Sequence, residues 1–176
     1  MNPDGFAEVI QTVHYYYGDG KGKTSAAVGA CIRAAGNGLR CAVIQFLKNG
    51  SSGEVAVLRQ LGIPVYSCTF QDVRFFREMN AAEQQTVINE HNANLRALLQ
   101  IPCGMIVLDE LGDAIRRDAV DAELVREMLS RRDCEIIVTG HTPVPLLLSS
   151  ADYITEFRCA AHPFRNGLPA RKGIEY

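Results

Sequence analysis

The sequence predicts a single α/β domain, built on a mostly parallel sheet with helices on both faces. Short apolar segments of strand-like composition alternate with longer segments of helical periodicity, which is typical of βαβ units. A glycine-rich loop joins the first strand to the first helix, and polar residues follow two later strands. At 176 residues the chain fits one domain, 1–176, in which we find no linker and no internal repeat.

The glycine-rich loop has the residues expected of a nucleotide-phosphate site. It lies between the β-favouring run Val13–Tyr17 and the helix-forming run Ala26–Val28. The loop itself reads Gly18, Asp19, Gly20, Lys21, Gly22, Lys23, Thr24 and Ser25. Its glycines allow successive backbone N–H groups to face one anion, next to the positive end of a helix. Lys23 adds a cation for the phosphates and Thr24 a hydroxyl ligand for Mg²⁺, which indicates a P-loop NTPase-like fold.

The loop departs in one place from the usual pattern G-x-x-x-x-G-K-[ST]. The first glycine of that pattern would fall on Tyr17, whereas the chain has its glycine one place later, at Gly18. A different interpretation is a glycine turn followed by an incidental Lys-Thr pair. The phosphate site is favoured because the glycine spacing, the strand before it and the helix after it all agree.

Composition excludes several classes of protein. With 18 basic and 20 acidic residues, the formal charge of −2 offers no field that would attract nucleic acid or an acidic membrane. No apolar run approaches membrane-spanning length, and residues 1–11 contain no basic residue, unlike a targeting signal. Six scattered cysteines without a C-x-x-C pair indicate buried thiols in a reducing compartment. We therefore expect a soluble cytoplasmic protein without nucleic-acid or membrane partners, and a flexible segment over residues 1–11.

The first half of the chain has clear helix and strand signals. A helix is expected over about 23–35, because Gly36-Asn37-Gly38 is a strong C-terminal signal. Leu39–Leu47 is predicted as a buried strand because it is almost continuously apolar. A short helix over Glu54–Gln60 and a short strand over Pro64–Ser67 follow.

The second half begins with an aromatic segment, Cys68–Met79, that we expect to be irregular. Asn80 then starts a long helix, because Glu83 three residues later completes a capping box. The apolar residues of this helix keep helical spacing: Val87, Ile88, Leu95, Leu98 and Leu99. The remaining elements are predicted as a strand Met105–Glu110, a helix Asp121–Arg131, a strand Glu135–Thr139, a helix Pro145–Ser150 and a strand Tyr153–Phe157.

Polar residues stand at the ends of two predicted strands. Asp109 and Glu110 close one of them, and Thr139-Gly140-His141 closes another. Ligands of parallel sheets gather at such carboxyl ends, so the acid pair is the partner of the phosphate loop that would hold Mg²⁺ directly or through water. The alternative is a strand end capped by two solvated acids. His141 is equally consistent with a turn residue and with a ligand contact.

A Mg²⁺–ATP site serves kinases, motors, switches and transferases alike, so these residues alone do not decide the activity. The run from Gly18 to Ala27 resembles the G-N-G-K-G-K-T-T-A-A loop, with its displaced glycine, of the ATP:corrinoid adenosyltransferases of cobalamin biosynthesis, the cob(I)yrinic acid a,c-diamide adenosyltransferase family. The similarity continues over nearly the whole chain, through Gln45–Lys48, Val107–Glu110, Thr139-Gly140, Ala151–Glu156, His162–Phe164 and Gly167–Tyr176.

This resemblance implies a reaction and its participants. The family transfers the 5′-deoxyadenosyl group of ATP to the cobalt of a Co(I) corrinoid and releases inorganic triphosphate. ATP is then bound in reverse, so that the loop holds the departing triphosphate. Since Co(I) is itself the nucleophile, no protein nucleophile or general base is required. The implied partners are ATP, Mg²⁺, the corrinoid, an electron-donating reductase and a second copy of the chain in a homodimer.

The resemblance also implies roles for individual residues. The ATP site would comprise Gly18 to Ser25, Arg33 on the helix behind the loop, Asp109 and His141. Lys23, Thr24 and Glu110 would be the catalytic residues, with Thr24, Glu110 and Asp109 around the metal. The corrinoid surface would comprise Phe70, Arg74, Phe75 and Phe76. The phenylalanines are equally consistent with an ordinary core.

Three departures from the family pattern leave other functions open. The chain has no tryptophan where relatives often have F-x-W, and it has Ala161 where lysine is common. His141 replaces a frequent arginine and would be uncharged for much of the time at neutral pH. The alternatives are a small-molecule kinase or ATPase, which would release ADP, and a non-catalytic homologue that binds corrinoid and ATP without turnover.

Overall fold

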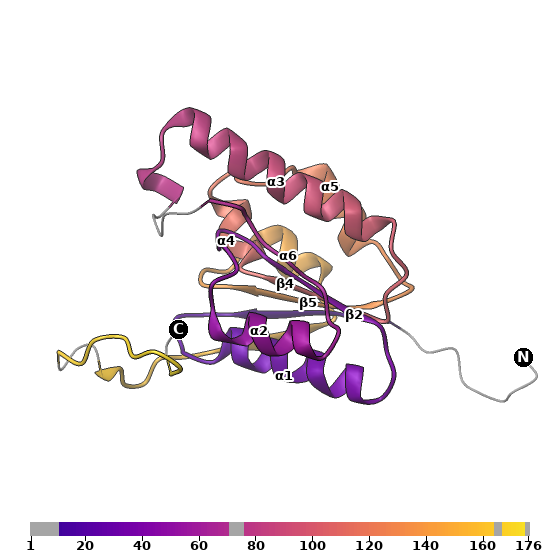
Figure 1. The fold of residues 1–176 in the computed structure, drawn as a ribbon, viewed down its shortest axis with the longest axis horizontal. Coiled ribbons are helices and arrows are strands. Elements are labelled where there is room, and N and C mark those ends of the chain that lie inside the picture. The colour runs from indigo at the N-terminus through magenta and orange to yellow at the C-terminus, as the bar shows by residue number, and fades with distance from the viewer. Residues whose placement is uncertain (1–10, 71–75, 164–166, 175–176) are drawn as a thin grey trace, which may run out of the picture.

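The computed structural model describes residues 11–70, 76–163 and 167–174 (Figure 1). Its centre is a six-stranded sheet in the order β3-β2-β4-β5-β1-β6, and all five strand pairs are parallel. The strands are β1 (Val13–Tyr17), β2 (Cys41–Gln45), β3 (Val65–Tyr66), β4 (Met105–Asp109), β5 (Glu135–Gly140) and β6 (Tyr153–Glu156). The predicted α/β fold is confirmed. The predicted flexible segment falls on residues 1–10, which lie outside the described residues, and on Gln11.

Helices cover both faces of the sheet, as predicted (Figure 1). They are α1 (Lys23–Gly36), α2 (Gly53–Gln60), α3 (Ala81–Leu99), α4 (Leu111–Arg116), α5 (Ala122–Leu129) and α6 (Pro145–Ser150). α1 and α2 lie on one face, and α3 to α6 lie on the other. The predicted capping box of α3 is present, because Asn80 Oδ1 accepts from Glu83 N (3.0 Å) and Glu83 Oε2 accepts from Asn80 N (2.8 Å).

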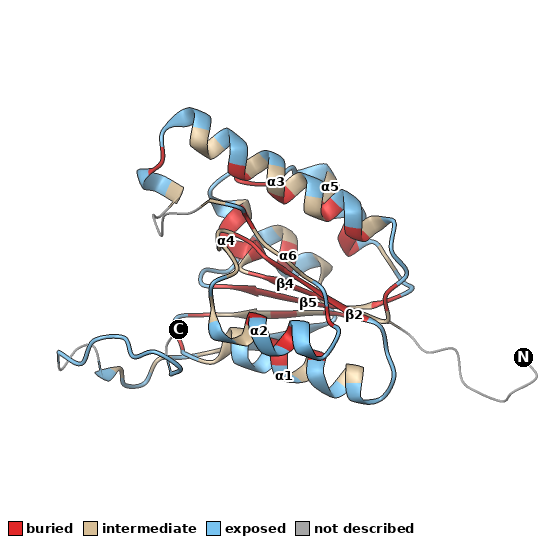
Figure 2. Ribbon diagram, in the orientation of Figure 1, coloured by how far each residue is buried: buried red, intermediate tan, exposed pale blue. Residues whose placement is uncertain are grey.

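Two apolar cores separate the sheet from these helices. Alternate residues of the central strands face opposite cores, as the pleat of a strand requires. Leu108 packs in one core with residues of α3 to α6, while its neighbour Val107 packs in the other with residues of α1 and α2. The central strands are accordingly the most deeply buried part of the fold (Figure 2). The cysteines are free thiols, five of them buried, as expected.

Two short elements were not expected from the sequence. α4 starts directly after β4, because Glu110 turns the chain with the left-handed φ of 62°. A six-residue helix offers too few turns for its periodicity to be recognised. A short 3₁₀ helix, Phe76–Glu78, precedes α3 within the segment expected to be irregular. None of the helices in the described residues is both long enough and apolar enough to span a membrane.

The strand order brings the phosphate loop beside the polar strand ends. β1 is the neighbour of β5, and β5 is the neighbour of β4, so the carboxyl ends of all three lie together. The loop is fixed there by backbone hydrogen bonds from Gly18 N to His141 O (3.0 Å) and from Gly20 N to Phe157 O (2.8 Å). Gly18 has a φ of 118°, and a Cβ at this position would meet Phe157 O at 2.2 Å. The loop glycines therefore permit a close backbone approach.

Candidate active site

The phosphate loop leads into the first turn of α1 and lines a cavity of about 730 Å³. Gly22, with a φ of 109°, turns the chain so that the helix begins at Lys23. The Lys23 ammonium donates to Gly20 O (2.7 Å), which holds the side chain over the loop. Burial lowers the pKa of Lys23 despite several nearby carboxylates. The loop amides, the helix start and this ammonium together have the chemistry that suits an anion, so the phosphate site stays a prediction.

Asp109 is fully buried at the end of β4 and accepts three hydrogen bonds. Its Oδ1 accepts from the Thr24 hydroxyl (2.8 Å) and from the Thr139 hydroxyl (2.8 Å), and its Oδ2 accepts from Lys48 Nζ (2.7 Å). Asp109 therefore contacts Thr24 at the end of the phosphate loop directly, while its predicted part in holding Mg²⁺ stays a prediction. Since three donors already occupy its oxygens, Asp109 acts here as an acceptor for neighbouring side chains.

Glu110 lies at the rim of the same cavity. Its backbone N–H donates to the Thr139 hydroxyl (2.8 Å), which supports the left-handed turn at this residue. Its Oε1 lies 3.2 Å from Lys48 Nζ, and its side chain is 25% exposed. Burial raises the pKa of Glu110, and the attraction of Lys48 only partly opposes this.

Lys48 is a central residue of the site that the sequence analysis did not single out. It was named there only within Gln45–Lys48, one of the segments that resemble the family. Its ammonium bridges Asp109 and Glu110. Burial disfavours the charged ammonium, but the two carboxylates more than offset this, so the pKa of Lys48 is raised. Lys48 follows β2, which is the neighbour of β4. Only the strand order, not the linear sequence, places it beside the acid pair.

The backbone before Lys48 is held by a buried histidine of α3. Leu47 has a left-handed φ of 57°, and its N–H donates to His91 Nε2 (3.0 Å). Since Nε2 must accept, Nδ1 carries the proton and donates to Ala119 O (2.8 Å). His91 is fully buried, and burial lowers its pKa, which favours this neutral form. His91 therefore fixes the point from which the Lys48 side chain extends.

His141 forms a pair with Asp113 of α4, a residue that the sequence did not single out. Asp113 Oδ2 accepts from the His141 backbone N–H (3.0 Å) and contacts His141 Nδ1 (2.9 Å). This hydrogen bond raises the pKa of His141 above its ordinary value of 6.5. The carboxylate of Asp113 therefore favours the imidazolium form of His141 more than the sequence alone indicates. The residue is both a fixed turn residue and a wall of the cavity.

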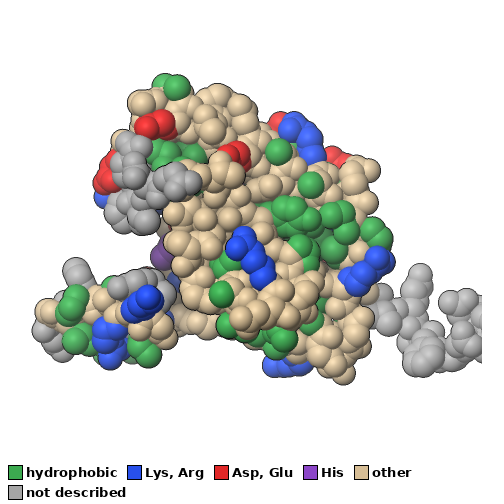
Figure 3. Space-filling model, in the orientation of Figure 1, with side chains coloured by type: hydrophobic (Ala, Val, Ile, Leu, Met, Phe, Trp, Pro, Cys, Tyr) green, Lys and Arg blue, Asp and Glu red, His purple; other side chains and the backbone are tan. Residues whose placement is uncertain are grey.

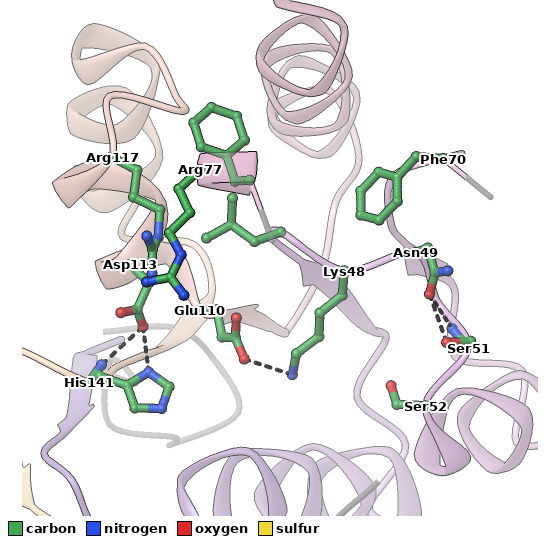
Figure 4. Close-up of a pocket in the computed structure, with 12 residues that line it drawn as sticks. Lys48, Asn49, Ser51, Ser52, Phe70, Arg77, Glu110, Asp113, Arg117 and His141 are labelled. Carbon is green, nitrogen blue, oxygen red and sulfur yellow. Dashed lines mark hydrogen bonds and ion pairs between the residues drawn. The ribbon is translucent and has the colours of Figure 1, made fainter. Parts of the chain in front are cut away.

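A second cavity, of about 470 Å³, adjoins the first (Figure 4). Phe70, Phe76 and Leu47 supply apolar walls, and Arg77 and Arg117 supply charge. Four residues line both cavities: Lys48, Ser52, Glu110 and His141. The segment after β6 extends from the body beside this region and carries apolar and basic side chains (Figure 3). Gly173 and Ile174 of that segment line the first cavity.

The structure brings most of the predicted site residues together. The loop, Asp109, Glu110 and His141 surround the first cavity or hold its walls, and Phe70 and Phe76 line the second. Arg33 is not near them: it is exposed in the last turn of α1, ten residues or about 15 Å along the helix from Lys23. Arg74 and Phe75 lie outside the described residues.

The family described as ATP:corrinoid adenosyltransferase BtuR/CobO/CobP matches residues 10–176, which is nearly the whole chain. The chain belongs to this family. The chain is therefore a member of an adenosyltransferase family, and the predicted resemblance is confirmed.

Individual relatives agree with the family. A corrinoid adenosyltransferase of Pseudomonas aeruginosa is 33% identical over 164 residues, covering 90% of this chain and 80% of its own. The corrinoid adenosyltransferase CobA of Salmonella typhimurium is 34% identical over 166 residues, covering 92% and 83%. A corrinoid adenosyltransferase of Escherichia coli is 32% identical with the same coverage. These adenosyltransferases give no support to the kinase interpretation.

Proposed function

We propose that this adenosyltransferase moves the 5′-deoxyadenosyl group of ATP to the cobalt of a Co(I) corrinoid and releases inorganic triphosphate. The observation that carries the proposal is the pair of adjoining cavities. One is lined by loop amides and Lys23, which suit a triphosphate, and the other has aromatic and apolar walls, which suit a large planar ligand. A group held at their common wall can pass from one ligand to the other.

The protein residues act by binding and by stabilising charge. The cobalt of the corrinoid substrate forms a bond to C5′ while the C5′–O bond breaks, and the electron pair of that bond leaves with the triphosphate. Lys23, the loop N–H groups and the start of α1 face the charge that accumulates on the leaving side. Alignment of C5′ with cobalt supplies the remainder of the rate enhancement.

The residues around Thr24 fit a Mg²⁺ ion bound with the phosphates. The Thr24 hydroxyl donates a hydrogen bond to Asp109, which leaves the lone pairs of the hydroxyl oxygen available to a metal. Glu110 would be the carboxylate ligand, with Asp109 holding Thr24 in place. No cluster of three or more His, Cys, Asp or Glu suited to a metal occurs among the described residues, which agrees with an ion held largely by phosphate and water. When bound, Mg²⁺ neutralises part of the triphosphate charge.

The second cavity would hold the corrin ring. Phe70 and Phe76 offer no donor atom, so they would favour cobalt without a lower axial ligand, and Arg77 and Arg117 would lie at the polar edge of the ligand. Arg74 and Phe75 are proposed for the same surface on family resemblance. A reductase that supplies Co(I) and a homodimer are proposed on that ground as well.

The test is an anaerobic incubation with ATP, Mg²⁺ and a chemically reduced corrinoid. We expect a light-sensitive adenosylated product and an equal amount of inorganic triphosphate, with no ADP. Release of ADP without corrinoid would place the protein among kinases or ATPases. Binding of both ligands without product would indicate a non-catalytic homologue.

ATP affinity is expected to fall as pH rises, because of His141. Its pKa is raised by Asp113, and Lys23 and Glu110 are the other charged groups that act on it. The imidazolium is present below this raised pKa and attracts phosphate. It is lost as pH rises above the ordinary value of 6.5 and through the raised one. The measurement is the Kd for ATP across this range in the wild type and in His141→Asn. ATP itself also titrates in this range, but this affects both proteins equally. If the Kd for ATP changed with pH in the same way in the wild type and in His141→Asn, the prediction would be contradicted.

Phe76→Ala is expected to impair the reaction selectively when it starts from a Co(II) corrinoid. Loss of the apolar wall would admit a lower axial ligand and make reduction harder, whereas ready-made Co(I) would still react at much of the wild-type rate. ATP affinity should be unchanged. Phe46→Ala is the matched control, since Phe46 is fully buried in the core and its loss should cost about 3–5 kcal/mol of stability and lower both rates together. If Phe76→Ala behaves like Phe46→Ala in melting and in both assays, Phe76 is an ordinary core residue.

A further inference from the structure

The two cavities meet at a wall of four shared residues, three of which have ionisable side chains. Lys48 and His141 are the basic residues, and Glu110 is the acidic one. In the proposed reaction the adenosyl group is joined to triphosphate in one cavity and to cobalt in the other. The bond that breaks therefore lies at this common wall, and so does the oxygen on which negative charge develops.

Lys48 is held at that wall with one donor to spare. An ammonium has three N–H bonds, and Lys48 uses two of them on Asp109 Oδ2 (2.7 Å) and Glu110 Oε1 (3.2 Å). Its side chain is 26% exposed and lines both cavities, and Figure 4 shows it pointing toward Glu110. Within the described residues the third N–H has no partner, so it can donate to a ligand that enters either cavity.

Lys48 is better placed for this oxygen than the other cations nearby. Lys23 lines the phosphate cavity but not the second one, and it donates to the loop. The His141 side chain is 59% exposed, so solvent competes for it, whereas Lys48 is held by two carboxylates. His91 fixes the backbone just before it. A hydrogen-bond donor that is already in position needs no reorganisation when charge develops in the transition state. Such a donor therefore contributes strongly to the reaction rate.

We propose that Lys48 is a catalytic residue, which donates a hydrogen bond to the oxygen that leaves C5′. This inference rests on the proposed adenosyl transfer. In the step, the Co–C5′ bond forms and the C5′–O bond breaks, cobalt passes from Co(I) to Co(III), and the electron pair of the broken bond remains on the triphosphate. Lys48 keeps its proton throughout, and its positive charge stabilises the oxygen as it becomes an anion.

The experiment compares Lys48→Met with the wild type under saturating ATP, Mg²⁺ and ready-made Co(I) corrinoid. We expect the single-turnover rate to fall by about 10²-fold or more, as for loss of one oxyanion donor. The Kd for ATP should change by no more than about threefold, because the contact strengthens only in the transition state. Arg96→Met is the matched control, since it removes one positive charge at an exposed site in the last turn of α3 and should leave both values unchanged.

The outcomes separate this inference from the proposed function. If the wild type forms no adenosylated product, the proposed function fails. If the wild type is active and Lys48→Met keeps its rate, or loses ATP affinity as much as rate, Lys48 is not catalytic. Lys48→Met leaves buried Asp109 without its cation, so melting is measured as well. If Lys48→Met does not fold, Lys48→Arg takes its place. The planar donors of arginine pair with the two carboxylates, so we expect a slower reaction than in the wild type. A wild-type rate in Lys48→Arg would overturn the proposal.

Discussion

Lys23→Ala is expected to lose most of the adenosyl transfer and to bind ATP more weakly. The Lys23 ammonium stands over the phosphate loop, and a charge-assisted contact to phosphate contributes on the order of 1.5–3 kcal/mol. That corresponds to roughly ten- to a hundredfold in affinity, with a further loss of turnover because the charge on the leaving triphosphate is less well stabilised. The Kd for ATP and the steady-state rate of adenosylation measure the two effects.

Loss of Lys23 and loss of Lys48 are expected to differ in how they change ATP affinity and reaction rate. Lys23 contacts the phosphates before and during the reaction, so its loss should change both affinity and rate. Lys48 should change the rate alone. Normal ATP affinity together with normal turnover in Lys23→Ala would rule out a phosphate site at this loop.

Gly18→Ala is expected to lower stability and to abolish tight ATP binding. The new Cβ would meet Phe157 O at 2.2 Å, and alanine would have to adopt a φ of 118°. The clash and the backbone strain together cost roughly 2–6 kcal/mol, and relief would displace the loop amides from their positions. Thermal melting and the Kd for ATP would both register the change.

Gly29→Ala is the matched control within the same region. Gly29 lies inside α1, is exposed, and has no atom within 4 Å of an added Cβ. Alanine is a better helix former than glycine, so this variant should gain up to about 1 kcal/mol and bind ATP normally. If Gly18→Ala melts and binds ATP like Gly29→Ala, the close approach of the loop to residue 157 is not what shapes the site.

The sheet and the loop could be predicted because their signals are local. Glycine spacing, the apolar strands and the capping box of α3 each depend on neighbouring residues in the chain. α4 was missed because its start depends on the left-handed turn at Glu110, a residue type that rarely adopts that conformation.

The charge network of the site could not be predicted in the same way. Lys48 and Asp113 meet their partners only through the strand order and the position of α4, which no short pattern encodes. The upward shift in the pKa of His141 could not be predicted either, since it depends on the contact with Asp113. Arg33 lies on the predicted helix, but its distance from the loop within one chain could not be read from the family pattern.

The strand order also bears on how the chain reaches this fold during synthesis. β1 pairs with β5 and β6 only, and its partners in β5 are about 120 residues further along the chain. At the usual 5–20 residues per second, the ribosome needs on the order of ten seconds to supply them. Throughout that interval the apolar β1 has no strand to pair with, and the loop that follows it lacks its contacts with residues 141 and 157. We expect nascent chains arrested before residue 130 to be unable to bind immobilised ATP and to be good chaperone substrates.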